Sequence, residues 1–233
     1  MDELVLVRHG ESLGNVARER AYADGAEVID IAERDADVEL SERGRRQATA
    51  VATALEVGAD DAVWSSNYLR ARQTAELALP PATFARVRVD ERLRDRELGI
   101  LDKLTGRGIL ARYPDEARRR RELGKFFHRP PGGESWADVA LRLRSWLHDV
   151  GPGRHVVFAH DAVIVLVRYV VEGLDERTAL RISDEEPLSN ASITVIRRDD
   201  GRWVNGAHGD SDHLGALETE HPSEPDPGRE AAS

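Results

Sequence analysis

Short apolar runs mark out a series of candidate strands. Residues 4–7 and 155–159 are almost continuously apolar, which is typical of strands that are buried on both faces of a sheet. Residues 61–66 form a third strand candidate. Near the end of the chain, residues 191–196 and 202–204 flank an Asp-Asp-Gly turn, and this pattern predicts a β-hairpin.

Helical spacing fills the intervals between these runs. Residues 41–55 carry apolar side chains at i, i+3, i+4 and i+7 behind an N-cap serine, and residues 135–150 form a similar helix behind a Ser-x-x-Asp capping box. In the second of these helices, Arg142 is expected to face water. Because strands alternate with helices, the sequence predicts an α/β fold, a three-layer α-β-α sandwich with a mostly parallel central sheet.

Composition favours one domain followed by an extension. The chain has 233 residues, of which 40% are hydrophobic, and we expect a single domain over residues 1–205. Residues 206–233 are acidic, contain three prolines and are poor in apolar side chains, so they are expected to form a disordered tail. His208 and His213 lie in this tail and are expected to be solvated rather than to bind a metal.

Cysteine content and charge exclude several classes of protein. The chain has no cysteines, which excludes disulfides and thiol catalysis. Its net charge of −10 argues against nucleic-acid binding, and no apolar run approaches the ~20 residues that a membrane helix needs. Asp2 and Glu3 stand where a leader sequence would begin with basic and apolar residues. We therefore expect a cytoplasmic protein with no membrane partner.

Candidate chemistry lies where the apolar runs stop. Arg8 and His9 follow the first run directly, and His160 follows residues 155–159. These side chains are expected to meet, because the carboxyl ends of parallel strands share the sheet edge where α/β proteins bind ligands. A neutral imidazole is a nucleophile, and a guanidinium binds phosphate oxygens in pairs. Arg70 adds a cation in the first turn of the next helix, where the helix N-terminus also favours anions.

Four strings of residues carry a resemblance to a known family. They are Leu-Val-Arg-His-Gly-Glu-Ser at 6–12, Leu-Ser-x-x-Gly-x-x-Gln-Ala at 40–48, Ser-Ser-x-x-x-Arg-Ala-x-x-Thr-Ala at 65–75 and Pro-Gly-Gly-Glu-Ser at 131–135. On these strings, the chain resembles the histidine phosphatase superfamily, also called phosphoglycerate mutase-like, from residue 4 to about residue 204. The resemblance implies the phosphoglycerate mutase-like fold and a phosphohistidine mechanism that uses no metal and no cofactor.

The matching positions imply a role for each candidate residue. In this reading His9 attacks phosphorus and forms phosphohistidine. Arg8, Arg70 and His160 hold the phosphoryl oxygens, and Asn15 adds a hydrogen bond. The expected partner is a small phosphorylated substrate.

Two positions depart from the family pattern. The family has Glu as the proton donor to the leaving oxygen where this chain has Asp95, which reaches one methylene less, and Glu97 is an alternative donor two residues further on. The arginines beside Asp95 oppose the protonated state that a general acid needs. After the second histidine, the family has Gly where this chain has Asp161, which is expected to cap the following helix. If Asp161 instead faces the pocket, it would orient an imidazole or weaken phosphate binding.

Other functions can be drawn from the same residues. A phosphoglycerate mutase would return the phosphoryl group to the substrate, but the longer motif that glycolytic mutases carry after residue 96 is missing, which favours the phosphatase branch. Gly-x-Ser-x-Gly is also the nucleophile-elbow pattern, and Ser12, Asp95 and His160 stand in the order of a serine-hydrolase triad. The two Asp substitutions also fit a non-catalytic protein that binds a phosphorylated ligand.

Two polar segments are expected to determine substrate specificity. Residues 16–40 have irregular apolar spacing, and loops of this length are often functional. Residues 103–130 are helical in composition and crowded with basic side chains. These cations form either a lid that attracts an anionic substrate or a solvated helix face.

Overall fold

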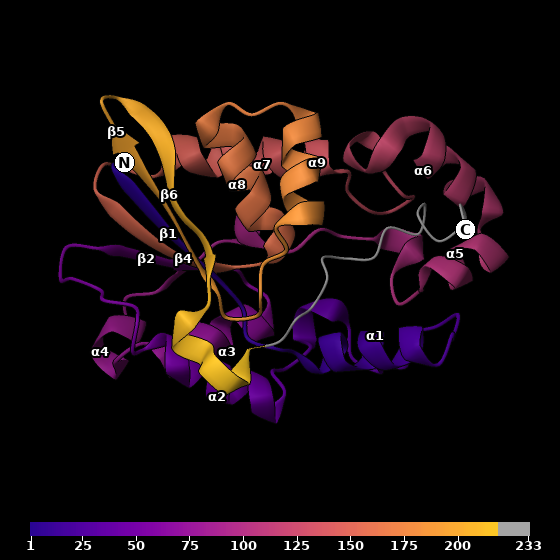
Figure 1. Cartoon of the computed structure of the whole chain (residues 1–233), viewed down its shortest axis with the longest axis horizontal. Helices are drawn as coiled ribbons and strands as arrows, with labels where there is room; N and C mark the ends of the chain where they lie inside the picture. Colours follow the sequence, from indigo (N-terminus) through magenta and orange to yellow (C-terminus); the bar gives the residue numbers. More distant parts are fainter. Residues whose placement is uncertain (219–233) are drawn as a thin grey trace.

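One six-stranded sheet organises residues 1–218, the part of the chain that the computed structural model describes (Figure 1). Its strands lie in the order β3-β2-β4-β1-β5-β6. They are β1 (Glu3–Arg8), β2 (Ala62–Ser65), β3 (Arg88–Val89), β4 (Arg154–Ala159), β5 (Ile193–Asp199) and β6 (Arg202–Asp210). The first four strands are mutually parallel, whereas β5 is antiparallel to both β1 and β6. The predicted mostly parallel sheet and the hairpin are confirmed.

Helices cover both faces of this sheet (Figure 1). One face carries α2 (Glu42–Val51), α3 (Leu69–Ala78) and α4 (Pro81–Phe84), and the other carries α7 (Trp136–Asp149), α8 (Asp161–Glu172) and α9 (Glu176–Glu185). To one side of this sandwich lie α1 (Leu13–Ala23), α5 (Gly106–Arg112) and α6 (Pro114–Phe127). Short 3₁₀ turns are η1 (Asp35–Asp37), η2 (Glu91–Leu93), η3 (Gly99–Leu101) and η4 (Asp212–Leu217).

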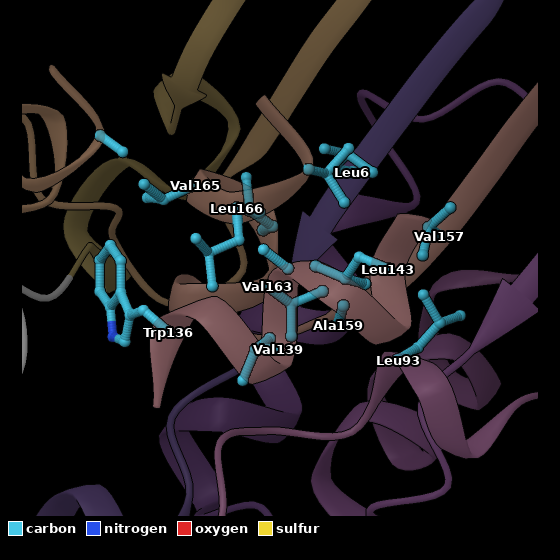
Figure 2. Packing of buried hydrophobic residues seen from close by; sticks show 14 of the residues in the cluster. Leu6, Leu93, Trp136, Val139, Leu143, Val157, Ala159, Val163, Val165 and Leu166 are labelled. Atoms are coloured by element: carbon cyan, nitrogen blue, oxygen red, sulfur yellow. The ribbon is translucent and has the colours of Figure 1, made fainter. Parts of the chain in front are cut away.

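The period of two along β1 explains the three layers. Leu4 and Leu6 belong to the core cluster that includes α7 and α8, whereas Val5 and Val7 belong to the cluster that includes α2 and α3. All four side chains are almost fully buried. Figure 2 shows the first cluster, in which Leu6 lies among side chains of α7 and α8. A strand with two buried faces is therefore apolar at every position, as the sequence indicated.

The domain boundary predicted at residue 205 is wrong. The chain continues through β6 and η4, and Leu214 of η4 is 3% exposed in the second core cluster. The carbonyl of Leu217 accepts a hydrogen bond of 2.8 Å from Gln47 Nε2 of α2. One buried apolar side chain and a few polar contacts hold this stretch, so its low apolar content was misleading. The rest of the predicted tail, residues 219–233, lies outside the described residues.

The two histidines of the predicted tail are also held against the domain. His208 Nε2 lies 3.1 Å from the carbonyl oxygen of Glu186, and His213 Nε2 lies 3.0 Å from that of Ala191. Both side chains are half-buried. The expectation that they are solvated is therefore wrong, because β6 and η4 bring them back onto the preceding elements.

The basic segment after residue 103 forms two helices rather than one. Pro114 occupies the first position of α6, where its missing N–H costs no hydrogen bond. Gly124 adopts a φ of 75°, which interrupts α6 one turn before its end. Within residues 1–218, no helix combines the length and the apolarity that crossing a membrane requires.

Candidate active site

The two parallel strands β1 and β4 deliver one histidine each to the same edge of the sheet. In the register of the two strands, Arg8 lies opposite Ala159. His9 and His160 are the residues that directly follow the two strands. The N–H of His9 donates to the carbonyl of Ala159 at 3.0 Å. The two imidazole rings lie 5.2 Å apart between centroids and are tilted by 60°. The sheet therefore brings together two side chains that are 151 positions apart in the sequence.

Two backbone crossings at glycines fix the turn that follows His9. A Cβ on Gly10 would lie 2.5 Å from the carbonyl oxygen of Gly44, and a Cβ on Gly44 would lie 1.9 Å from the carbonyl oxygen of Glu11. The first turn of α2 can therefore pack directly on the turn after β1. The Glu11 carboxylate accepts a short hydrogen bond from the Ser41 hydroxyl across this contact. The glycines thus serve helix packing rather than a close ligand approach.

Hydrogen bonding fixes the tautomer of His9. Nδ1 lies 2.7 Å from the carbonyl oxygen of Gly10. Because a carbonyl only accepts hydrogen bonds, Nδ1 carries the proton and Nε2 keeps its lone pair. Burial, followed by the positive charge of Arg70, holds the pKa of His9 well below its usual range. His9 is therefore a neutral imidazole with Nε2 available as a nucleophile.

His160 is held through its other ring nitrogen. Its Nε2 lies 2.9 Å from Ser66 Oγ, and its Nδ1 lies 3.4 Å from Asp95 Oδ2. Because the Asp95 carboxylate can only accept, the ring proton is placed on Nδ1, and the Ser66 hydroxyl then donates its own proton to Nε2. Burial, followed by the charges of Arg70 and Arg142, holds the pKa of His160 well below its usual range. Sequence analysis missed Ser66, although it stands directly after β2 within a quoted motif.

Arg70 joins the parts of the site. The side chain is 4% exposed, and its Nε donates to His9 Nε2 at 3.3 Å. Its Nη2 donates to Asp95 Oδ2 at 2.9 Å, and both terminal nitrogens also contact Asp35. Burial alone would lower the pKa of Arg70, but the two carboxylates outweigh it and raise that pKa. Arg72, two residues further along α3, is exposed.

Of the two candidate proton donors, the structure places Asp95 in the site and Glu97 at its rim. Asp95 lines the cavity, whereas the Glu97 side chain is 47% exposed and accepts the hydroxyl of Tyr68 at 2.8 Å. Burial alone would raise the pKa of Asp95, but Arg70 and the N–H of Arg96 outweigh it and lower that pKa. Asp95 is therefore ionised in the empty site.

Arg142 of α7 holds the segment that carries Asp95. Its Nη2 donates to the carbonyl of Asp95 at 3.1 Å, and its Nε donates to Glu134 Oε1 at 2.9 Å. The side chain is only 10% exposed, so the expectation that it faces water is wrong. Helical periodicity placed it on the polar side of α7, but its long side chain reaches across to the segment after η2. Glu134 belongs to the Pro-Gly-Gly-Glu-Ser string, and its carboxylate holds the Arg142 guanidinium in place.

Arg8 and Asn15 line the same cavity as the two histidines. Arg8 is 7% exposed and donates a short hydrogen bond from Nη1 to the carbonyl of Leu188. Burial lowers its pKa, against the opposing charges of Asp161 and Asp95. Asn15 Oδ1 accepts the N–H of the residue that caps α1, at 3.0 Å. Only the amide nitrogen of Asn15 therefore remains to donate to a ligand.

Ser12 caps α1 and does not form a triad with His160. Its Oγ accepts the N–H of Asn15 at 3.1 Å and donates to Asn15 Oδ1 at 3.0 Å. The two ring nitrogens of His160 instead face Ser66 and Asp95. The serine-hydrolase arrangement of Ser12, Asp95 and His160 is therefore not assembled.

Asp161 does not cap α8, which corrects the expectation from the sequence. It is the first residue of that helix, the N-cap position is His160, and no side-chain capping bond is formed there. Asp161 instead lines the cavity, where its charge opposes the effect of burial on the pKa of Arg8. Arg8 therefore lies beside an additional negative charge in the cavity.

The cavity, of about 130 Å³, extends to α6. Arg120 and Lys125 line it, and each side chain is 7% exposed. Because Gly124 interrupts the helix, Lys125 turns inward, with Nζ 3.2 Å from Ser183 Oγ and 4.7 Å from the ring centre of Trp136. Other basic residues of this segment are exposed, namely Arg112, Arg118, Arg119, Arg121 and Arg129. The segment therefore supplies both a solvated face and two cations in the cavity wall.

The donor set suits an anion better than a metal. Within residues 1–218, His9, Asp95 and His160 form the group whose metal-ligand atoms lie within 4.8 Å of one another. However, the Arg70 guanidinium points at both His9 Nε2 and Asp95 Oδ2. A fixed cation in that position repels a metal ion and attracts a phosphoryl group.

Known proteins are similar to this chain in both sequence and fold. A model described as Histidine phosphatase superfamily (branch 1) matches residues 4–211. Phosphoglycerate mutase-like protein 4 of Arabidopsis thaliana is 31% identical over 225 residues, which cover 91% of this chain and 86% of that protein. The 2,3-bisphosphoglycerate-dependent phosphoglycerate mutase 2 of Gloeobacter violaceus is 32% identical, over 78% of this chain and 81% of its own length. A solved mycobacterial glucosyl-3-phosphoglycerate phosphatase is 28% identical, with a TM-score of 0.71 over 90% of this chain and 99% of that one.

Proposed function

Because this chain belongs to the histidine phosphatase superfamily, branch 1, we propose that it hydrolyses a small phosphate monoester through a phosphohistidine on His9. The observation that carries this proposal is the state of His9. Its Nδ1 proton is engaged by the carbonyl of Gly10, so the Nε2 lone pair faces the guanidinium of Arg70. A neutral imidazole aimed at a phosphate-binding cation is arranged for attack on phosphorus.

In the first step, a bond forms between His9 Nε2 and phosphorus, and the bond from phosphorus to the leaving oxygen breaks. Arg8, Arg70 and the Nδ1–H of His160 offset the negative charge on the phosphoryl oxygens. These donors are buried, which strengthens their interaction with the charge that develops during the reaction. The leaving oxygen takes a proton from Asp95.

Substrate binding itself supports the protonation of Asp95. In the empty site, Arg70 is the main group that lowers the pKa of this carboxyl. A bound phosphoryl group shares that guanidinium and brings negative charge beside Asp95, so the pKa rises. In the second step, Asp95 accepts a proton from water, the water oxygen bonds to phosphorus, and the bond to His9 Nε2 breaks.

The cavity wall supports a substrate whose alcohol carries a second anionic group. Arg120 and Lys125 are buried cations on that wall. Glycerate derivatives carry a carboxylate, and relatives above are named for phosphoglycerate and for glucosyl-3-phosphoglycerate. We propose this class of substrate, small and doubly anionic, with neither nucleic acid nor membrane as a partner. The cytoplasmic location stays a prediction.

A mutase is the second candidate, because a named mutase is 32% identical to this chain. The same phosphohistidine would then return its phosphoryl group to the substrate. The longer motif of glycolytic mutases is missing after residue 96, which supports hydrolysis. Measuring phosphate release and isomerisation of 3-phosphoglycerate in parallel distinguishes the two reactions. Isomerisation that exceeds hydrolysis would select the mutase.

The mechanism is tested by trapping the intermediate. Rapid mixing with excess p-nitrophenyl phosphate, an alkaline quench and mass spectrometry should place one phosphoryl group on His9. His9→Asn should remove both the adduct and turnover, whereas His148→Asn, on the exposed side of α7, should change neither. Phosphate binding without any trapped adduct would instead support a non-catalytic phospholigand-binding protein.

A further inference from the structure

Asp35 places a carboxylate inside the phosphate site, and the proposed mechanism does not use it. Asp35 is the first residue of η1, between α1 and α2. Its Oδ1 lies 3.0 Å from Arg70 Nη1 and its Oδ2 lies 3.3 Å from Arg70 Nη2, so the two side chains form a paired contact. The carbonyl of Asp35 also accepts from Nη1, at 2.6 Å.

These contacts leave Arg70 without a spare donor. A guanidinium side chain carries five N–H bonds. Arg70 makes five contacts as a donor, three of them to Asp35, one to Asp95 and one to His9. A phosphoryl oxygen that binds Arg70 must therefore displace a resident acceptor.

The Asp35 carboxylate is the acceptor that can leave at the lowest cost. Its side chain is 43% exposed, against 27% for Asp95. The second oxygen of Asp95 is held by the N–H of Arg96 at 2.9 Å, whereas within residues 1–218 the Asp35 carboxylate has Arg70 as its hydrogen-bond partner. A phosphoryl dianion would also repel this carboxylate directly.

We propose that Asp35 is an internal competitor of the phosphoryl group, which occupies Arg70 in the empty site and is displaced when substrate binds. This inference rests on the proposed function, because it assumes that Arg70 binds phosphate. The return of Asp35 to Arg70 then assists the release of inorganic phosphate. The residue thereby weakens the binding of substrate and product alike, and it prevents the site from being blocked by its own product.

The test compares the affinity of two variants for inorganic phosphate and orthovanadate by titration calorimetry. Asp35→Asn keeps the shape of the side chain and removes its charge. We expect its dissociation constant for each anion to fall roughly tenfold, which equals about 1.4 kcal/mol. The KM for p-nitrophenyl phosphate should fall with it, while kcat does not rise. Asp37→Asn is the matched control, because it removes an exposed charge from the same 3₁₀ turn and should change neither constant.

Each outcome separates this inference from the proposed function. If the unmodified protein binds neither anion, the phosphate site itself is wrong. If it binds them and Asp35→Asn binds them equally or more weakly, the competitor role is overturned and Asp35 merely positions Arg70. Hydrogen exchange of the unmodified protein gives a second measurement that needs no variant. Exchange at residues 33–38 should rise when orthovanadate is added, and unchanged or slower exchange would contradict displacement.

Discussion

The two active-site histidines occupy equivalent places and are held in opposite ways. His9 follows β1 and His160 follows β4, two parallel six-residue strands in direct register. His9 is tethered through Nδ1 to the carbonyl of Gly10, so its Nε2 is free of a proton. His160 is tethered through Nε2 to the hydroxyl of Ser66, and its Nδ1, which faces the Asp95 carboxylate, carries the proton.

This difference assigns different chemistry to two residues that the sequence presents as equals. In the proposed mechanism, the lone pair at Nε2 lets His9 act as the nucleophile, whereas the N–H at Nδ1 lets His160 donate a hydrogen bond to a phosphoryl oxygen. The tether of His9 is a backbone carbonyl of the adjacent residue, which no substitution removes. The tether of His160 is a side chain from another strand end, so it can be tested by mutation.

The largest effect should come from exchanging the histidines for asparagine one at a time. His9→Asn removes the nucleophile, so kcat should fall by about 10⁴-fold or more and no phosphoenzyme should form. His160→Asn removes one donor, so kcat should fall roughly 10²- to 10³-fold while a phosphoenzyme still accumulates. Stopped-flow turnover and quench trapping measure both quantities. Equal losses, with no adduct in either variant, would contradict the division of roles.

The strands and the convergence of the histidines could be predicted, because the burial of a strand determines which of its positions are apolar. Every side chain of a strand with two buried faces is apolar, so residues 4–7 and 155–159 stand out, and parallel pairing then brings their carboxyl ends together. Which nitrogen of each ring carries the proton could not be predicted. The tautomers depend on one carbonyl, one carboxylate and one hydroxyl whose positions are set by tertiary packing.

Individual side-chain contacts account for most of the features that could not be predicted from the sequence. Arg142 was assigned to water because helical periodicity describes where the backbone points, not where a long guanidinium side chain ends. Asp35 lies in a segment with no period at all, so nothing indicated its contact with Arg70. Leu214 anchors a stretch whose composition otherwise resembles a tail. In each case one side chain, rather than a pattern, decides the structure.

Asp95, the carboxylate beside His160, is tested by comparing two substrates whose leaving groups differ in their need for a proton. Asp95→Asn cannot donate a proton, so the rate of phosphoenzyme formation from an alkyl phosphate should fall roughly 10²-fold. With p-nitrophenyl phosphate, whose leaving group needs no proton, the burst of p-nitrophenol that accompanies phosphoenzyme formation should slow several-fold at most. Steady-state turnover should fall for both substrates, because Asp95 also takes the proton of the attacking water. Glu97→Gln, which lies at the rim, should affect both substrates little. An equal slowing of phosphoenzyme formation from both substrates in Asp95→Asn would show that Asp95 is not the general acid.

Both histidines should make the protein less stable in acid. Their pKa values are held well below 6.5 in the folded state, so protons bind first to the unfolded chain. The contribution of these two histidines to the free energy of unfolding is therefore fully present above about pH 6.5. It is lost as the pH falls, by about 1.4 kcal/mol per pH unit for each histidine. His160→Asn should reduce that slope by one such step, whereas the exposed His148→Asn should not. Urea unfolding from pH 7 downwards measures the slope, and identical slopes would contradict the assigned protonation states.

The smallest expected effect tests the tether that distinguishes His160 from His9. Ser66→Ala removes the hydroxyl that holds Nε2, so the ring of His160 keeps only its contact with Asp95. Because a neutral hydrogen bond contributes about 0.5–1.5 kcal/mol, kcat should fall roughly two- to tenfold. Formation of the phosphoenzyme should remain, since His9 keeps its own tether. Ser66→Thr, which keeps a hydroxyl, should restore most of the rate. If the alanine variant is unaffected, the contact with Asp95 is enough to hold the ring of His160, and the Ser66 tether does not contribute to the rate.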